Sequence, residues 1–146
     1  MEKFNHIELN NEVTKRGDNG FFRLEKDQEA IAEFLREVDY KTVKFSSEIK
    51  RLRYLVEENY YYNIFDKYIE DEIVECLELA KNFKFEFKSY MAASKFYKDY
   101  ALKTNDKKQY LENFNQHVFI VAMYLGDGNT ALAKELMIAM LEQRLQ

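Results

Sequence analysis

Apolar residues recur along most of the chain at the spacing of an α-helix. Ile31, Phe34, Leu35 and Val38 stand at i, i+3, i+4 and i+7, which predicts a helix over about 27–40. The same kind of pattern predicts further helices through residues 49–56, 64–69, 73–80, 90–100, 109–125 and 130–140. The chain therefore reads as a succession of helices joined by short polar connections.

Residues that start and stop helices stand beside several of these segments. Ser46 or Ser47, Ser89 and Asn129 each precede a helical pattern and have the short polar side chain that caps a helix N-terminus. Gly126 follows the pattern over 109–125, where a residue without a side chain suits the left-handed backbone after a helix.

The beginning of the chain predicts a small β-hairpin. Ile7 and Leu9 alternate with polar residues, Asn19-Gly20 is a strong turn signal, and Phe21 to Leu24 would form the return strand. The predicted fold is mainly α, with a small N-terminal β-hairpin followed by a bundle of about six to seven helices.

The stretch 82–88 alternates strictly between polar and aromatic residues and predicts an extended connection. We expect its aromatic side chains to point inward and its lysines outward. The alternative is a platform for single-stranded nucleic acid, because such platforms combine basic and aromatic side chains. The residues concerned are Lys81, Phe83, Lys84, Phe85, Phe87 and Lys88.

Composition narrows the class of protein. The chain of 146 residues contains no Pro and only 4 Gly, which favours long helices. Its net charge of −4 argues against a nucleic-acid partner. No apolar run reaches the roughly 20 residues of a membrane-spanning helix, and no apolar signal segment is seen near Met1. With a single Cys, these features predict a cytoplasmic protein without membrane contact.

Side chains that could carry chemistry are few. Cys76 could be a redox thiol, but its apolar neighbours favour a small buried side chain instead. His6 and His117 do not form a metal-ligand pattern, so no metal site is expected. The acidic run 70–72 suits the positive end of a helix. From the residues alone, the chain is a mainly helical domain without a recognisable catalytic site.

Four segments resemble the large (α) subunit of class Ib ribonucleotide reductases. The most specific is the run from Phe85 to Asp106, whose length makes it far more selective than a short motif. The resemblance continues through residues 110–112 to 142–144 and so covers nearly the whole chain. The other three segments are 7–13, 24–30 and 54–58.

The resemblance implies where the chain would act. The family converts ribonucleoside diphosphates to deoxyribonucleotides for DNA replication, and a metal cofactor with a tyrosyl radical resides in the partner β subunit. The catalytic and redox cysteines lie in a barrel that would follow residue 146. The chain should therefore be inactive alone and hold no cofactor, with the remainder of the large subunit and the β subunit as its partners.

Two domain assignments and one alternative follow from the same resemblance. Residues 1–85 correspond to the N-terminal region, with a shortened ATP-cone-like start, and 86–146 begin the helical lead-in to the barrel. The alternative is a stand-alone helical interaction module that modulates a reductase or another partner.

The resemblance also implies an allosteric site for dATP, dAMP or ATP in the shortened cone. Where some relatives have His and Asn, this chain has Ser46 and Ser47, and helix capping is the alternative role of these hydroxyls. The candidate nucleotide-binding residues are Lys44, Phe45, Ser46, Ser47, Lys103, Asn105 and Lys107.

The last two helical patterns are so apolar that part of their surface should need cover from another chain or segment. Phe119, Val121, Met137 and Met140 are the candidate interface residues. We expect this surface to mediate self-association or binding to the barrel.

Overall fold

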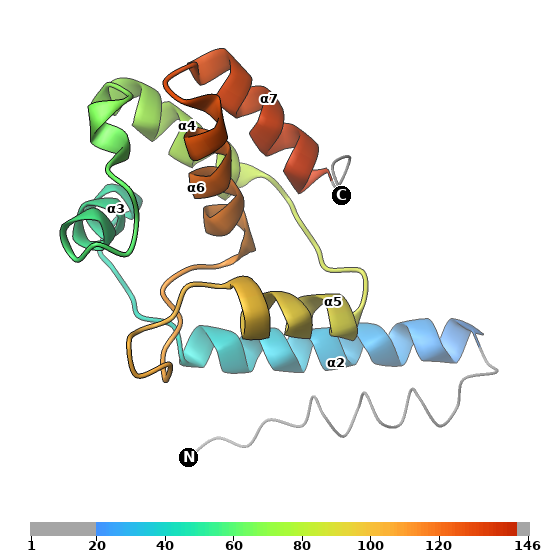
Figure 1. The fold of residues 1–146 in the computed structure, drawn as a ribbon. Helices are drawn as coiled ribbons and strands as arrows, with labels where there is room; N and C mark the ends of the chain where they lie inside the picture. Colours follow the sequence, from blue (N-terminus) through green and yellow to red (C-terminus); the bar gives the residue numbers. More distant parts are fainter. Residues whose placement is uncertain (1–19, 143–146) are drawn as a thin grey trace. The chain divides into compact units, whose positions relative to one another are not determined.

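The computed structural model describes residues 20–142, and these are mainly helical, as predicted (Figure 1). The α-helices are α2 (Gly20–Tyr40), α3 (Glu48–Glu57), α4 (Glu70–Asn82), α5 (Tyr90–Lys95), α6 (Phe114–Gly126) and α7 (Thr130–Leu141). Two short helices complete the described part: a 3-10 turn, η1 (Ile64–Asp66), and a π-helical turn, η2 (Phe96–Tyr100), which directly continues α5.

The first described helix, α2, begins earlier than predicted and stands in place of one strand of the expected hairpin. α2 starts at Gly20, so Phe21, Phe22 and Leu24 are helical and the predicted return strand is wrong. No Pro or Gly interrupts the chain between Gly20 and Tyr40, and the apolar positions 21 and 24 extend the helical spacing of Ile31 and Val38. The other half of the hairpin, with Ile7 and Leu9, lies outside the described residues.

The described chain forms two compact units, each assembled from two separate stretches. Unit 1 combines the residues up to Val43 with Glu86–Leu111. Unit 2 combines Lys44–Phe85 with the residues from Glu112 onward. Each unit therefore contains one stretch that lies before residue 86 and one that lies after residue 85. The contacts inside each unit join residues that are far apart in the sequence.

Unit 1 is built around the packing of α5 along α2 (Figure 1). The Phe34 ring meets the edges of Tyr90 and Tyr97 at centroid distances of 5.6 and 5.9 Å. Asp27 on α2 accepts a hydrogen bond from the backbone N–H of Tyr90, 3.2 Å away, at the start of α5. Aromatic contacts and this side-chain cap together align the two helices.

Unit 2 has a core in which α4, α6 and α7 pack against one another, with Leu52 of α3 added to it. Phe119 and Met123 of α6 and Met137 of α7 are fully buried. The buried side of α7 consists of Ala133, Met137 and Leu141. Each of these follows directly after a residue of a second, adjacent apolar stripe, which consists of Leu132, Leu136 and Met140.

The helix caps largely follow the sequence prediction. Ser47, Ser89 and Asn129 each accept a hydrogen bond from the backbone N–H three residues later. α6 begins later than the predicted residue 109, because Asn113 and Gln116 form a reciprocal capping box that defines its first turn.

The extended connection before α5 places aromatic rings inward and lysines outward, as expected. Phe87 is buried, Phe85 stacks on Phe114 with ring centroids 4.0 Å apart, and Lys84 and Lys88 are exposed. Phe85 belongs to unit 2 and Phe87 to unit 1, so neighbouring inward positions of one stretch serve different cores.

The turn between α6 and α7 requires Gly126 for a reason other than the predicted left-handed backbone. The left-handed residue is Asp127 (φ 44°), whereas Gly126 is the last residue of the helix. A Cβ at Gly126 would lie 2.8 Å from the Tyr68 hydroxyl oxygen and 2.9 Å from Cβ of Ala133. The absence of a side chain therefore permits the close approach of α6 and α7.

Replacing Gly126 by Ala should destabilise the protein by about 1–3 kcal/mol, because overpacking outweighs the better helix propensity of Ala. Chemical denaturation of the wild type and G126A measures this difference. Adding Tyr68→Phe removes the nearer clashing atom, so the double variant should be more stable than the sum of the single effects. Strictly additive effects, or a stabilised G126A, would contradict the close contact.

Candidate functional site

Within the described residues, Arg51 and Glu112 are the buried charged side chains, each 3% exposed, and both belong to unit 2. Arg51 lies on the inner side of α3, next to Leu52 and four residues before Leu55, which are both fully buried. Glu112 immediately precedes the capping residue of α6. Isolated charges are too costly to bury, so the contacts around this pair determine whether the arrangement is stable.

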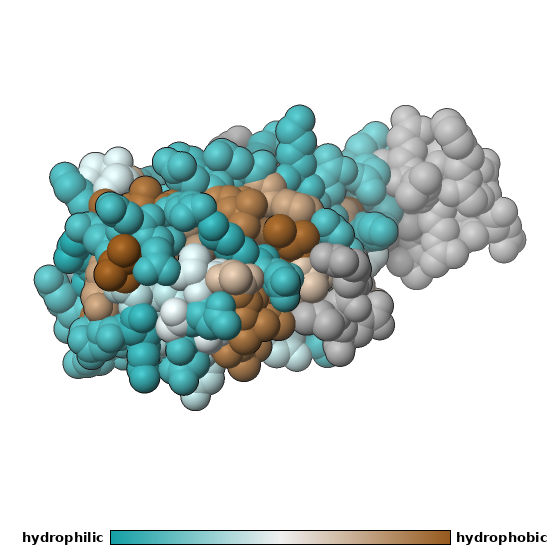
Figure 2. All heavy atoms as spheres, turned by 90° about the horizontal axis from the view of Figure 1, so that it is seen from above, coloured by the Kyte–Doolittle hydropathy of each residue, from teal (hydrophilic) through white to brown (hydrophobic). Residues whose placement is uncertain are grey.

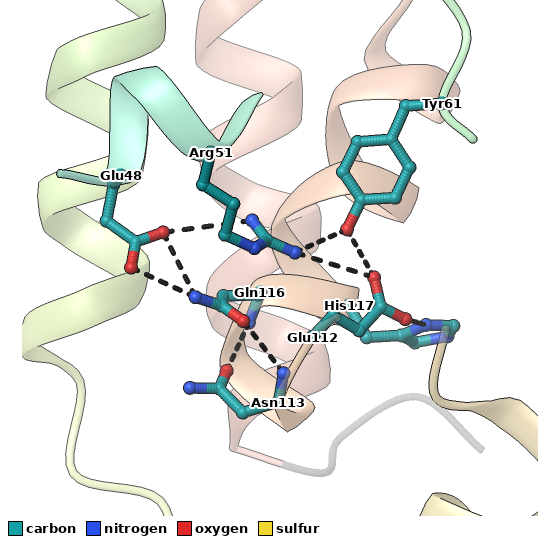
Figure 3. Close-up of polar contacts among 7 residues, drawn as sticks. All are labelled: Glu48, Arg51, Tyr61, Glu112, Asn113, Gln116 and His117. Carbon is teal, nitrogen blue, oxygen red and sulfur yellow. Dashed lines mark hydrogen bonds and ion pairs between the residues drawn. The ribbon is translucent and has the colours of Figure 1, made fainter. Parts of the chain in front are cut away.

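Tyr61 joins the two buried charges (Figure 3). The guanidinium of Arg51 donates to the Tyr61 hydroxyl oxygen at 2.7 Å, and that hydroxyl donates to Oε2 of Glu112. The Arg51 Nη2 atom also lies 3.9 Å from the same carboxylate oxygen, within ion-pair distance. Arg51 and Glu112 are thus paired both directly and through a shared phenol.

The second carboxylate oxygen of Glu112 contacts His117. His117 lies one turn into α6, and its Nδ1 atom is 2.7 Å from Oε1 of Glu112 (Figure 3). Both oxygens of the buried carboxylate therefore have polar partners, as a buried charged group requires.

A partly exposed layer of contacts lies beside the buried pair. Glu48, the first residue of α3, is 3.7 Å from Nη1 of Arg51. The side-chain amide of Gln116 donates to both Glu48 oxygens, at 2.9 and 3.1 Å. The oxygen of the same amide accepts from the backbone N–H of Asn113 at 2.8 Å, so one side chain contacts the start of both helices.

The chemistry available here is binding and orientation. Burial raises the pKa of Tyr61 well above its usual value, with the Arg51 charge acting in the opposite direction and Glu112 adding to the increase. The phenol therefore remains a neutral hydrogen-bond donor at physiological pH. No grouping of metal-ligating side chains occurs within residues 20–142.

Cys76, the chain's single cysteine, is fully buried in the unit 2 core. Burial raises the pKa of its thiol, although the charge of Lys134 acts in the opposite direction. A protonated thiol without solvent access is a poor nucleophile. Its environment agrees with the interpretation of Cys76 as a small apolar side chain.

The candidate nucleotide residues fall into two sets, one in each unit. In unit 2, Lys44 and Ser46 are exposed, and the Phe45 ring lies 5.4 Å from the Tyr54 ring. The Ser47 hydroxyl accepts from the backbone N–H of Lys50, which is the capping role considered as the alternative.

In unit 1, the second set surrounds a tight turn. Nζ of Lys103 donates to the carbonyls of Lys98 and Ala101, at 3.1 and 3.2 Å, and lies over the Tyr110 ring. Asn105 and Lys107 are exposed on this turn.

Asp106 closes the turn in unit 1 by accepting from the Thr104 hydroxyl and from the backbone N–H of Lys108, at 2.6 and 3.0 Å. These hydrogen bonds lower the pKa of Asp106, the one to Thr104 most strongly. The carboxylate that stabilises the turn therefore adds a negative charge beside Lys107.

Two of the four candidate interface residues are not at the surface. Phe119 and Met137 are fully buried in the core of unit 2, so the expectation that they are exposed is wrong. Val121 and Met140 are partly buried against the core. The sequence pattern missed Leu125, which is 53% exposed.

The polar network itself was also missed from the sequence. A signal existed in Arg51, which shares the inner side of α3 with Leu52 and Leu55. Its partner Glu112 is 61 positions further along, in a stretch predicted to be helical, so no local spacing could connect the two.

Replacing Arg51 by Met should lower the free energy of unfolding by about 3–5 kcal/mol, because it leaves Glu112 buried without its cation. Arg53→Met is the matched control on the same helix: Arg53 is half exposed and pairs with Glu70, so its loss should cost less than about 1 kcal/mol. Urea denaturation of both variants tests the difference, and equal effects would contradict the importance of the buried pair.

Among residues 20–142, every helix is too short or too polar to span a membrane.

Two protein-family models match the chain: "Ribonucleotide reductase N-terminal" over residues 6–85 and "Ribonucleotide reductase, all-alpha domain" over residues 86–146. Together they cover almost the full sequence.

Individual relatives agree with the family models. The ribonucleoside-diphosphate reductase subunit alpha of Bacillus subtilis is 42% identical over 96% of this chain, and the NrdEB subunit alpha of Bacillus phage SPbeta is 41% identical over 97%. The subunit alpha of Mycoplasma pneumoniae is 35% identical over 97%. This chain spans only 20%, 13% and 19% of the lengths of these relatives, respectively. The chain therefore belongs to the ribonucleotide reductase family and corresponds to the N-terminal region of a ribonucleoside-diphosphate reductase large subunit.

Proposed function

We propose that this chain acts within a class Ib ribonucleoside-diphosphate reductase as a structural and subunit-contact region. The match to alpha subunits across nearly the whole chain carries the proposal. The substrates of the assembly would be ribonucleoside diphosphates, and the radical-bearing β subunit would be a further partner. The cellular location that fits this role is the cytoplasm.

The residues of this chain support a role outside the chemical step. Reduction of a ribose hydroxyl consumes two electrons, which a pair of thiols can supply by forming a disulfide. This sequence has one cysteine, Cys76, and it is buried with a raised pKa. We therefore assign no catalytic residue to the chain and expect it to be inactive alone.

The α6–α7 hairpin is the proposed contact surface. Val121 and Leu125 lie four residues apart on α6, and Leu132, Leu136 and Met140 follow one another at the same interval on α7, so each set forms one stripe. Leu125 and Leu132 are 53% and 38% exposed, and the other three pack only partly against the core. Figure 2 shows apolar residues reaching the surface between hydrophilic ones.

We propose that the remainder of a reductase large subunit covers this hairpin, with a second copy of this chain as the alternative occupant. Both helices are apolar nearly all round, which is typical of helices buried on every side.

Leu125→Glu should weaken association, because it places a charge where apolar contact is proposed. The measurement is sedimentation velocity of the chain alone and mixed with a reductase large-subunit fragment that lacks the region. Met91→Glu is the matched control, since Met91 is 78% exposed but lies in unit 1 on α5. The proposed surface would be contradicted if the wild-type chain stayed monomeric and did not bind the fragment. It would also be contradicted if Leu125→Glu and Met91→Glu changed association equally.

We further propose weak binding of dATP, dAMP or ATP. The supporting residues in unit 2 are Lys44, which is exposed and precedes the aromatic Phe45, and in unit 1 Asn105 and Lys107 on the exposed turn. Lys103 is a weaker candidate than the sequence indicated, since its ammonium group already bonds two carbonyls.

Binding should fall in the micromolar to millimolar range, equivalent to about 4–8 kcal/mol. When dATP is titrated into the protein, the amide chemical shifts of Phe45 or Asn105 should change. The variants Lys44→Ala and Lys107→Ala then show which of the two units contacts the phosphate groups. Lys81→Ala, which changes an exposed lysine at the end of α4, is the charge-matched control. If dATP shifts no resonance near either set, the chain is purely structural.

A further inference from the structure

One side chain takes part in the start of two helices. The Gln116 side-chain oxygen accepts from the backbone N–H of Asn113 and completes the capping box of α6. Its nitrogen donates to both carboxylate oxygens of Glu48, the first residue of α3. A displacement of Glu48 therefore acts directly on the group that holds the first turn of α6.

A second, buried connection joins the same two turns. Arg51, one turn into α3, bonds Tyr61 and pairs with Glu112, which precedes α6. We call the four residues Glu48, Arg51, Glu112 and Gln116 the α3–α6 clamp (Figure 3). Its contacts are hydrogen bonds and ion pairs, which depend on direction more strongly than apolar packing does.

The segment before α3 is attached to the same helix. Ser47 caps α3 by accepting from Lys50, and the Phe45 ring packs against Tyr54 two turns along. A change in the position of residues 45–47 must therefore move α3 or break these contacts. Separating buried polar groups from the partners they have is costly, so the clamp favours one joint arrangement of α3 and α6.

We propose that the α3–α6 clamp is a conformational relay that transmits a change at residues 44–47 to the first turn of α6. The proposal rests on the proposed nucleotide site for its natural input, which would be a nucleoside polyphosphate held beside Lys44. Its output is the helix that carries Val121 and Leu125 of the proposed contact surface. Ligand binding and association would then be coupled through groups within one compact unit.

Ser47→Ala in the full chain tests the relay without any ligand. Losing the cap should loosen α3 and raise amide exchange rates about fivefold, both at Lys50 and at Asn113 and Gln116 in the α6 capping box. Asn129→Ala removes the equivalent cap from α7 and is the matched control. It should leave exchange at Asn113 and Gln116 unchanged. A Ser47→Ala effect that stops within α3 would overturn the relay.

Two further variants, each of which breaks one part of the α3–α6 clamp, test whether the clamp transmits the effect of Ser47→Ala. Glu48→Ala removes the partly exposed link and should reduce the effect of Ser47→Ala on Asn113. The combination Arg51→Met, Tyr61→Phe and Glu112→Leu replaces the buried link by apolar groups without stranding a charge, and should reduce it further. An undiminished effect in Glu48→Ala would contradict transmission through the clamp, even where the triple variant fails to fold.

Addition of dATP separates the relay from the proposed nucleotide site. Shifts at Phe45 that extend to Asn113 support both, whereas shifts at Phe45 that stop there contradict the relay alone. If dATP shifts nothing while Ser47→Ala still affects Asn113, the relay stands and the nucleotide site is refuted.

Discussion

The Glu112 carboxylate imposes the main constraint on unit 2, because a charge with almost no solvent contact must receive its partners from the protein. Arg51, Tyr61 and His117 supply them from α3, from the connection after it and from α6. Each of these side chains has to be in place for both oxygens of the buried carboxylate to keep a polar partner. The positions of α3 and of the start of α6 are therefore mutually dependent, although apolar packing supplies most of the core.

The remainder of unit 2 is organised around α6. Phe119 and Met123 of α6 are fully buried in the core that this helix shares with α4 and α7, and the missing side chain of Gly126 lets α7 approach α6 closely. The hairpin retains apolar stripes that the described residues cover only in part. These stripes form the surface that we propose for contact with a further protein segment.

Relations between neighbouring residues were predictable from the sequence. The helical spacing around Ile31, the capping residues Ser47 and Asn129, and the inward rings of the 83–87 stretch depend on contacts within a few positions. The family relationship was also recognisable, because it rests on residue identities. The predicted strand at 21–24 was wrong because turn residues favour a hairpin locally, whereas the continuous helical spacing extends α2 to Gly20.

Only the tertiary structure decided which polar groups are buried and which apolar groups are exposed. Arg51 meets Glu112 across 61 positions, and Phe119 is buried while Leu125 on the same helix is exposed. From Val118 onward α6 is apolar on all sides, so its sequence there has no pattern that distinguishes an inner from an outer face. The sequence by itself therefore determined the helices, their caps and the family, while the packing of distant segments determined the charged clamp and the exposed stripes, because burial depends on neighbours that no local pattern specifies.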